Sequence, residues 1–249
     1  MNTARGLKPV LRSTLLFLGM DITKNLEYDF LVRKVCKRLL TPDSNCIDIG
    51  AYSGEASKIF ARRASNGNHW AFEPSPILSE ELKNKFSNTK VSVFQKALGN
   101  ASKTTPYFHC ENDLSFSSLR PRKSTCFTPD YKEIMVEQLT LDKAIPQDWH
   151  EKIDLIKISG GGAEYQILEG AESLLKSSNP YLLFSFDQDA PEYYQNGVQS
   201  LWNLLVKKHN YKLYSVRNWL HNHNELNFKD LDGIFHSNSE YVYIGVPNS

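Results

Sequence analysis

Short apolar runs alternate along the chain with longer segments of helical periodicity. The runs predict strands at 46–49, 69–72, 91–94, 153–158, 181–186, 211–216 and 241–246. The periodic segments predict helices over 26–40, 55–64, 77–86, 163–176 and 198–208. Strands and helices that alternate with short connections are typical of a parallel sheet with right-handed crossover connections. The pattern therefore predicts an α/β fold with one seven-stranded, doubly wound sheet and helices on both faces.

The segment before the first predicted strand, residues 1–44, is interpreted as an N-terminal helical extension. Within it, Thr41-Pro42-Asp43 is expected to end the helix at 26–40. The apolar positions that define this helix are Leu26, Phe30, Leu31, Val35 and Leu39.

Residues 100–150 also depart from the alternation of strands and helices. Candidate strands at 106–110 and 134–139 flank a stretch at 115–130 that is rich in Ser, Pro and Lys. We interpret this region as an insertion that carries a substrate-facing loop. It would interrupt a single domain that spans residues 45–249.

Composition excludes several classes of protein. Hydrophobic residues make up 41% and charged residues 23%, so the chain is expected to fold on its own. With 29 basic against 28 acidic residues and no block of like charge, nucleic acid is not an expected partner. The apolar stretch Leu15–Met20 is far shorter than the roughly 20 residues of a membrane span. Four cysteines, Cys36, Cys46, Cys110 and Cys126, fit neither a zinc site nor a disulfide framework. We expect a cytoplasmic protein without membrane insertion.

The strongest chemical signal is the segment Asp48-Ile49-Gly50-Ala51-Tyr52-Ser53-Gly54, which follows the first predicted strand. Open parallel sheets bind ligands beyond the carboxyl ends of their strands, and glycine there permits close approach of the backbone. Glu73 ends the second strand, 23 residues after Gly50, where a carboxylate can accept hydrogen bonds from two ribose hydroxyls.

Tyr52 occupies the position at which a dinucleotide site has its second glycine. A pyrophosphate would meet this bulky side chain, which disfavours NAD and FAD. S-adenosylmethionine has a ribose and an adenine but no phosphate, so it tolerates a turn with fewer glycines. The alternative is a purely structural turn with Glu73 facing solvent.

With these features the chain resembles the FkbM-type methyltransferase family over about residues 45–215. The matching segments are 46–55, Phe72-Glu73-Pro74-Ser75-Pro76, Ala97-Leu98-Gly99, Leu139-Thr140-Leu141-Asp142, Lys157-Ile158, Gly162-Ala163-Glu164 and Ile167-Leu168-Glu169-Gly170-Ala171. The resemblance implies a class I methyltransferase (Rossmann-like) fold, S-adenosylmethionine as cofactor, and O-methylation of a hydroxyl on a sugar, polyketide or similar small molecule. By position, Asp48, Gly50, Ala51, Tyr52 and Gly54 would lie on the methionine side, Glu73 and Pro74 at the ribose, and Ala97 at the adenine edge.

The family's usual Lys-Ile-Asp-Val-Glu-Gly-Ala-Glu reads Lys157-Ile158-Ser159-Gly160-Gly161-Gly162-Ala163-Glu164 in this chain. Two carboxylates are therefore missing where the acceptor would approach, and Phe184-Ser185-Phe186 also lacks an acid common in the family. A carboxylate there would serve as a base or orient the hydroxyl. The remaining candidates for catalysis are Lys157, Ser159, Glu164 and Asp142.

Several further residues are candidates for the site, and each also has an ordinary structural explanation. His109 is a candidate proton acceptor, Ser117 and Ser118 are candidate contacts to acceptor or cofactor, and Gly160-Gly161-Gly162 is a candidate anion nest. His221 and His223 lack further identifiable ligands, so no metal site is predicted.

The sequence thus favours an S-adenosylmethionine-dependent O-methyltransferase acting on a small hydroxylated acceptor, expected to be a saccharide. The missing acids leave open a catalytically impaired nucleoside-binding module. A nicotinamide-dependent oxidoreductase is the third alternative. Oligomeric state is not predicted.

Overall fold

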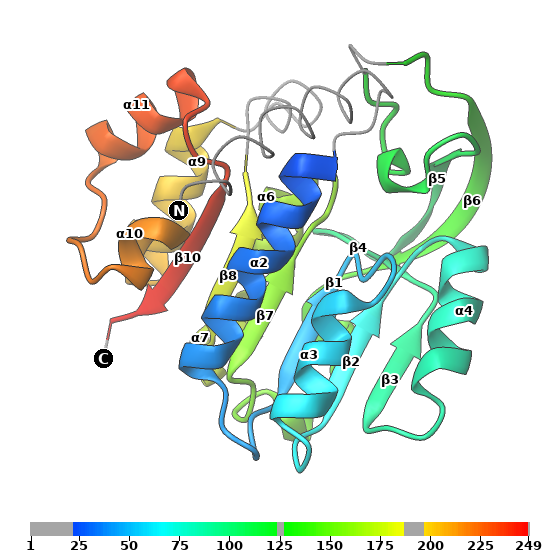
Figure 1. The fold of residues 1–249 in the computed structure, drawn as a ribbon, viewed down its shortest axis with the longest axis horizontal. Coiled ribbons are helices and arrows are strands. Elements are labelled where there is room, and N and C mark those ends of the chain that lie inside the picture. The colour runs from blue at the N-terminus through cyan, green and yellow to red at the C-terminus, as the bar shows by residue number, and fades with distance from the viewer. Residues whose placement is uncertain (1–21, 124–126, 187–196, 249) are drawn as a thin grey trace, which may run out of the picture.

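Seven strands form one mixed sheet at the centre of the molecule (Figure 1). The computed structural model describes residues 22–123, 127–186 and 197–248. In sheet order the strands are β3 (Val91–Phe94), β2 (His69–Phe72), β1 (Cys46–Ile49), β7 (Leu155–Ile158), β8 (Tyr181–Ser185), β10 (Val242–Pro247) and β9 (Tyr211–Ser215). The first five strands in this order, β3 to β8, run parallel to one another. This arrangement confirms the predicted seven-stranded, doubly wound α/β sheet.

β10, the last strand along the chain, runs in the opposite direction to its neighbours. The apolar pattern did not reveal this direction. β10 pairs antiparallel with both β8 and β9. Strand direction is a property of the connections, and α10 (Val216–Leu220) and α11 (Phe228–Ser237) lie between β9 and β10. Neither helix was predicted.

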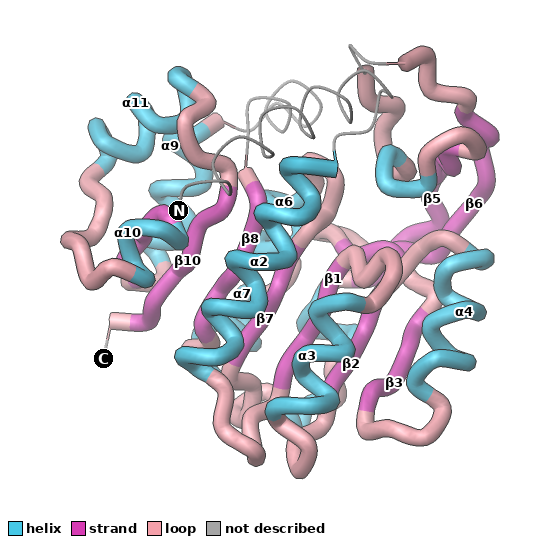
Figure 2. Tube along the Cα trace, in the orientation of Figure 1, coloured by secondary structure: helices cyan, strands magenta, loops and turns pink. Residues whose placement is uncertain are grey.

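Helices cover both faces of the sheet (Figure 2). On one face pack α2 (Ile22–Leu39), α3 (Glu55–Arg63), α4 (Pro76–Phe86) and α10. On the other face pack α5 (Leu141–Ala144), α6 (Glu164–Glu169), α7 (Glu172–Ser178), α9 (Val198–Trp202), the π-helical turn η3 (Asn203–Lys208) and α11. Neighbours in a strand point to opposite faces, so Cys46 contacts the first layer and Ile47 the second.

Helix α2 packs on the sheet through only part of the stripe that its apolar spacing suggested. Leu31 and Val35 are buried, together with Val32 and Cys36, against side chains of β1, β7 and β8. Leu26 and Phe30 are 60% and 55% exposed. The N-terminal helix is thereby part of the same apolar core as the sheet.

The insertion forms a second, three-stranded sheet together with the short strand that precedes it. Its strands are β4 (Ala97–Leu98), β6 (Tyr131–Leu139) and β5 (Lys103–Cys110), and β5 and β6 pair antiparallel. The candidate strands at 106–110 and 134–139 are present, and each begins three residues earlier than predicted. The short helix η1 (Leu114–Phe116) follows β5, whereas residues 124–126, including Cys126, lie outside the described residues.

The predicted helix at 163–176 is two helices, α6 and α7, separated at Gly170. A Cβ at Gly170 would lie 2.1 Å from the carbonyl oxygen of Gly99, so only glycine lets the insertion approach this break. A second 3-10 turn, η2 (Gln147–Trp149), precedes β7.

Among the described helices, none combines the length and the apolar character that crossing a bilayer requires. The stretch Leu15–Met20 lies outside the described residues.

We expect Leu31→Ala to lower the free energy of unfolding by about 2–5 kcal/mol, because it removes a buried side chain between α2 and the sheet. Leu26→Ala on the same helix is the matched control and should change stability by less than about 0.5 kcal/mol. Urea denaturation of both variants measures the difference. Equal losses would show that α2 does not dock through this stripe.

Candidate functional site

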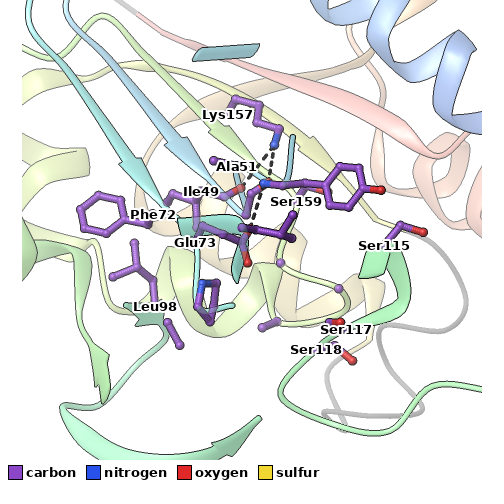
Figure 3. A pocket seen from close by; sticks show the side chains of 18 of the residues that line it. Ile49, Ala51, Phe72, Glu73, Leu98, Ser115, Ser117, Ser118, Lys157 and Ser159 are labelled. Atoms are coloured by element: carbon purple, nitrogen blue, oxygen red, sulfur yellow. Dashed lines mark hydrogen bonds between the residues drawn. The ribbon is translucent and has the colours of Figure 1, made fainter. Parts of the chain in front are cut away.

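A cavity opens where the carboxyl ends of β1, β2 and β7 meet the insertion and α2 (Figure 3). Its lining includes Tyr28, Asp29, Gly50, Ala51, Tyr52, Phe72, Glu73, Pro74, Lys96, Ala97, Leu98, Tyr107, Ser115, Ser117, Ser118, Arg122, Lys157, Ser159, Gly160 and Gly161. In Figure 3, Phe72 and Leu98 lie on one side of Glu73, and Ser115, Ser117 and Ser118 lie on the other. The cavity therefore has an apolar end and a hydroxyl-rich end.

The turn after β1 requires glycine for a reason internal to the protein. Gly50 has φ +66°, and a Cβ there would lie 2.0 Å from the carbonyl oxygen of Ser159. Gly54 has φ +77°, and a Cβ there would meet Leu82 of α4 at 2.5 Å. Gly50 thus allows β7 to approach the turn, and Gly54, which does not line the cavity, allows α4 to pack on it.

A buried ion pair holds this turn in place. The Asp48 carboxylate lies 2.9 Å from Lys157 Nζ, and their side chains are 1% and 6% exposed. Lys157 also donates to the carbonyl oxygen of Gly50 at 2.9 Å, while Asp48 Oδ2 accepts from the amide and hydroxyl of Ser57 at 3.0 and 2.6 Å. Asp48 itself does not line the cavity. Lys157 and Asp48 therefore join β1, β7 and α3 around the turn.

Glu73 reaches the cavity from the end of β2. Its Oε2 accepts from the amide of Tyr52 at 2.8 Å and its Oε1 from the amide of Ser75 at 2.9 Å. Each carboxylate oxygen has a second lone pair, so further donors can still bind. Burial raises the pKa of Glu73 above its ordinary value, and the two amide hydrogen bonds oppose that rise.

These features fit the cofactor that the resemblance implies. The apolar end, formed by Phe72, Ala97 and Leu98, suits an adenine ring, and Glu73 suits the ribose next to it. The Tyr28 hydroxyl is a second polar group at the cavity; it is buried and lacks a hydrogen-bond partner within the described part of the chain. A buried hydroxyl without a partner requires an explanation, such as a bound water or a ligand group. Burial raises the pKa of Tyr28 well above its ordinary value, so its hydroxyl stays protonated.

The four candidates for catalysis occupy different places. Lys157 and Ser159 line the cavity. Glu164 does not; its Oε1 accepts from the amide of Gly160 at 2.8 Å and holds the glycine segment in place. Asp142 also lies outside the lining, and its two oxygens accept from the amides of Ser173 and Leu174 at the start of α7. The structure thus brings only Lys157 and Ser159 together with the predicted cofactor residues.

The glycine segment has a defined shape. Gly161 and Gly162 have φ +61° and +100°, a region that residues with a Cβ rarely adopt. A Cβ at Gly161 would lie 3.0 Å from Cβ of Ser118. A glutamate at position 161, as in the family's usual motif, would strain this loop and press on the insertion.

The remaining candidates divide between the cavity and the rest of the fold. Ser117 and Ser118 line the cavity, and their contact with acceptor or cofactor stays a prediction. His109 is buried in β5 and does not line it. His221 and His223 are exposed, and no group of three or more His, Cys, Asp or Glu side chains suited to a metal occurs in the described ranges.

Sequence reasoning missed the cavity residues that come from α2 and the insertion. These are Tyr28, Asp29, Tyr107, Ser115 and Arg122. Tyr28 lies one turn before Val32 on the buried side of α2, which is the signal that could have pointed to it. Nothing in the local sequence marks Tyr107 or Arg122, because their position depends on how the second sheet packs on the first.

Comparisons with known proteins agree with this architecture. A family model described as "Methyltransferase FkbM domain" matches residues 48–224, which is more than half of the chain. Among curated proteins, no sequence matches. The crystal structure of an FkbM methyltransferase from Methylobacillus flagellatus KT superposes with a TM-score of 0.51 at 14% identity, and the match covers 83% of this chain and 44% of that one. This chain therefore spans less than half of that protein.

Two further solved structures have lower scores. A precorrin-6y C5,15-methyltransferase from Geobacter metallireducens GS-15 gives a TM-score of 0.42 at 16% identity, with 75% of this chain and 72% of that chain covered. A SAM-dependent methyltransferase from Aquifex aeolicus gives 0.41 at 13% identity, with 74% and 80% covered.

We expect Asp48→Asn to lower the free energy of unfolding by about 3 kcal/mol or more, because it leaves Lys157 charged and buried without its counterion. Glu55→Gln is the control, since its exposed ion pairs with Lys58 and Lys85 should contribute less than about 1 kcal/mol. Chemical denaturation at neutral pH measures both. A loss for Asp48→Asn no larger than that of the control would refute the role given to this pair.

Proposed function

Because the chain belongs to the FkbM methyltransferase domain family, we propose that it transfers a methyl group from S-adenosylmethionine to a hydroxyl of a small molecule, and that the acceptor is a saccharide. The observation that carries this proposal is the position of Glu73, a buried carboxylate that directly follows β2 and lines the cavity between its apolar end and its hydroxyl-rich end. The nearly balanced charge of the chain supports a small acceptor rather than nucleic acid.

When bound, S-adenosylmethionine would supply an electrophilic methyl group that is bonded to its sulfonium sulfur. On the protein side, Gly50 and Ala51 form the floor of the turn, and the pair of Asp48 and Lys157 keeps that floor fixed. Glu73 holds the ribose and so sets the distance from the apolar end to the reacting end. We assign Tyr28, whose hydroxyl lacks a partner within the described residues, to polar groups of the ligand on the α2 side.

The acceptor hydroxyl approaches from the hydroxyl-rich end, beside Ser159 and the glycine segment. Its oxygen would accept the methyl group that the cofactor supplies, and its proton would pass to water or a nearby base. Ser159 is a weak base without an activating partner. Alignment of the two reactants can itself supply much of the acceleration, so transfer does not require a strong base.

We expect Glu73→Gln to weaken binding of S-adenosylhomocysteine about tenfold at neutral pH, because bonds to a charged acceptor are stronger than bonds to a neutral one. Since the pKa of Glu73 is raised, the carboxylate protonates at a higher pH than usual. The affinity of the native protein for S-adenosylhomocysteine should therefore be highest above the pKa of Glu73 and should fall as the pH decreases through that pKa. The variant should lack this pH dependence.

Titration calorimetry at several pH values measures this effect. Glu80→Gln removes an exposed carboxylate of α4 and serves as the charge-matched control, with affinity expected to stay unchanged. Native-like affinity and pH dependence in Glu73→Gln would exclude Glu73 from the cofactor site.

We expect Ser159→Asp to raise kcat about tenfold or more on an accepted substrate, because general-base assistance typically contributes 10²- to 10⁴-fold, of which a newly placed carboxylate supplies part. Gly161 is left unchanged since its backbone conformation excludes a larger residue. Mass spectrometry of products after incubation with S-adenosylmethionine measures the rate. A reduced kcat would instead mean that the serine and glycines are adapted to the acceptor.

A further inference from the structure

Among the described residues, three cations line the cavity, and they differ in how their charge is compensated. Lys157 is paired with Asp48, and Lys96 is paired with Glu137. Arg122 also lines the cavity, but its guanidinium has no carboxylate partner among the described residues. Its positive charge is therefore the one least compensated by this part of the chain.

The position of Arg122 is fixed by two independent contacts. The Tyr131 hydroxyl accepts from the Arg122 amide and donates to the Arg122 carbonyl oxygen, both at 2.9 Å. The guanidinium carbon lies 4.9 Å from the centre of the Phe116 ring, which in turn packs edge-on against Phe127 at 4.9 Å. An arginine held at both backbone and side chain loses little conformational freedom when it binds a ligand.

The Arg122 guanidinium lies over the ring of Phe116, whose chain neighbours are Ser115 and Ser117, and this places it at the hydroxyl-rich end of the cavity. Ser115, Ser117 and Ser118 line the same wall, which the insertion forms (Figure 3). This wall touches the end of β7, because Ser118 lies against Gly161. The carboxylates at the cavity, Asp29, Glu55 and Glu73, come instead from α2, α3 and the end of β2.

We propose that Arg122 binds an anionic group of the acceptor, a carboxylate or a phosphate, while the hydroxyl to be methylated faces Ser159. This inference rests on the proposed function and narrows its acceptor to an acidic sugar. The planar guanidinium donates two parallel hydrogen bonds to either anion, which orients the sugar as well as attracting it. A neutral sugar would leave Arg122 without its counterion at this wall.

The test measures binding of three sugars to the protein loaded with S-adenosylhomocysteine. D-Glucuronate and D-glucose 6-phosphate carry the two anions, and D-glucose is the neutral counterpart. We expect at least one anionic sugar to bind about tenfold or more tightly than glucose, and Arg122→Gln to abolish the preference. Comparison of the two anionic sugars distinguishes carboxylate from phosphate.

Arg120→Gln is the matched control. It removes the same charge two residues away, from an exposed side chain outside this cavity, and should keep the preference. Glucose binding as tightly as both anionic sugars, or no detectable binding of either anionic sugar, would overturn the proposal. Unchanged preference in Arg122→Gln would do the same.

The affinity for S-adenosylhomocysteine separates this inference from the proposed function. It should be the same in Arg122→Gln as in the native protein, which also shows that the variant is folded. A selective loss of that affinity would mean that Arg122 serves the cofactor, and the acceptor role would be wrong. Failure of the native protein to bind S-adenosylhomocysteine would instead refute the methyltransferase proposal itself.

Discussion

The buried ion pair of Asp48 and Lys157 is the interaction on which the site depends. It joins neighbouring strands β1 and β7, and through Ser57 it also holds the start of α3. Burying two charges costs free energy that only good geometry offsets. Here the lysine gains a carbonyl partner in the turn and the aspartate gains two donors. The turn that forms the cavity floor is consequently held by charge as well as by packing.

Much of the central sheet could be predicted because its signals are local. A strand buried on both faces reads as a mostly apolar run, and the predicted strands 46–49 and 69–72 match the buried strands β1 and β2 in full. The predicted strand 91–94 matches the edge strand β3. The glycines at 50 and 54 were also identified, although for the approach of a ligand. The structure shows that Gly50 admits the backbone of Ser159 and Gly54 admits α4, so their conformational freedom first serves the protein's own packing.

What could not be predicted depends on contacts between distant segments. Asp142 and Glu164 matched positions in the family's motifs, yet one carboxylate binds the start of α7 and the other binds the amide of Gly160. The orientation of such a carboxylate depends on which backbone amides near it need a hydrogen-bond acceptor. Those amides become its neighbours only when the chain folds. The exposed Leu26 and the cavity-facing Tyr28 on α2 show the same limit, because apolar spacing locates a helix but not its rotation on the sheet.

The second sheet divides the cavity between two structural units. The turns after β1, β2 and β7 contribute Gly50, Glu73 and Ser159. The helix η1 and the loop after it contribute Ser115, Ser117, Ser118 and Arg122. The antiparallel pairing of β5 and β6 closes within the insertion, so the loop between them can vary without disturbing any strand of the main sheet. In evolutionary terms, substitutions confined to that loop can reshape one side of the pocket while the side formed by the main sheet stays unchanged.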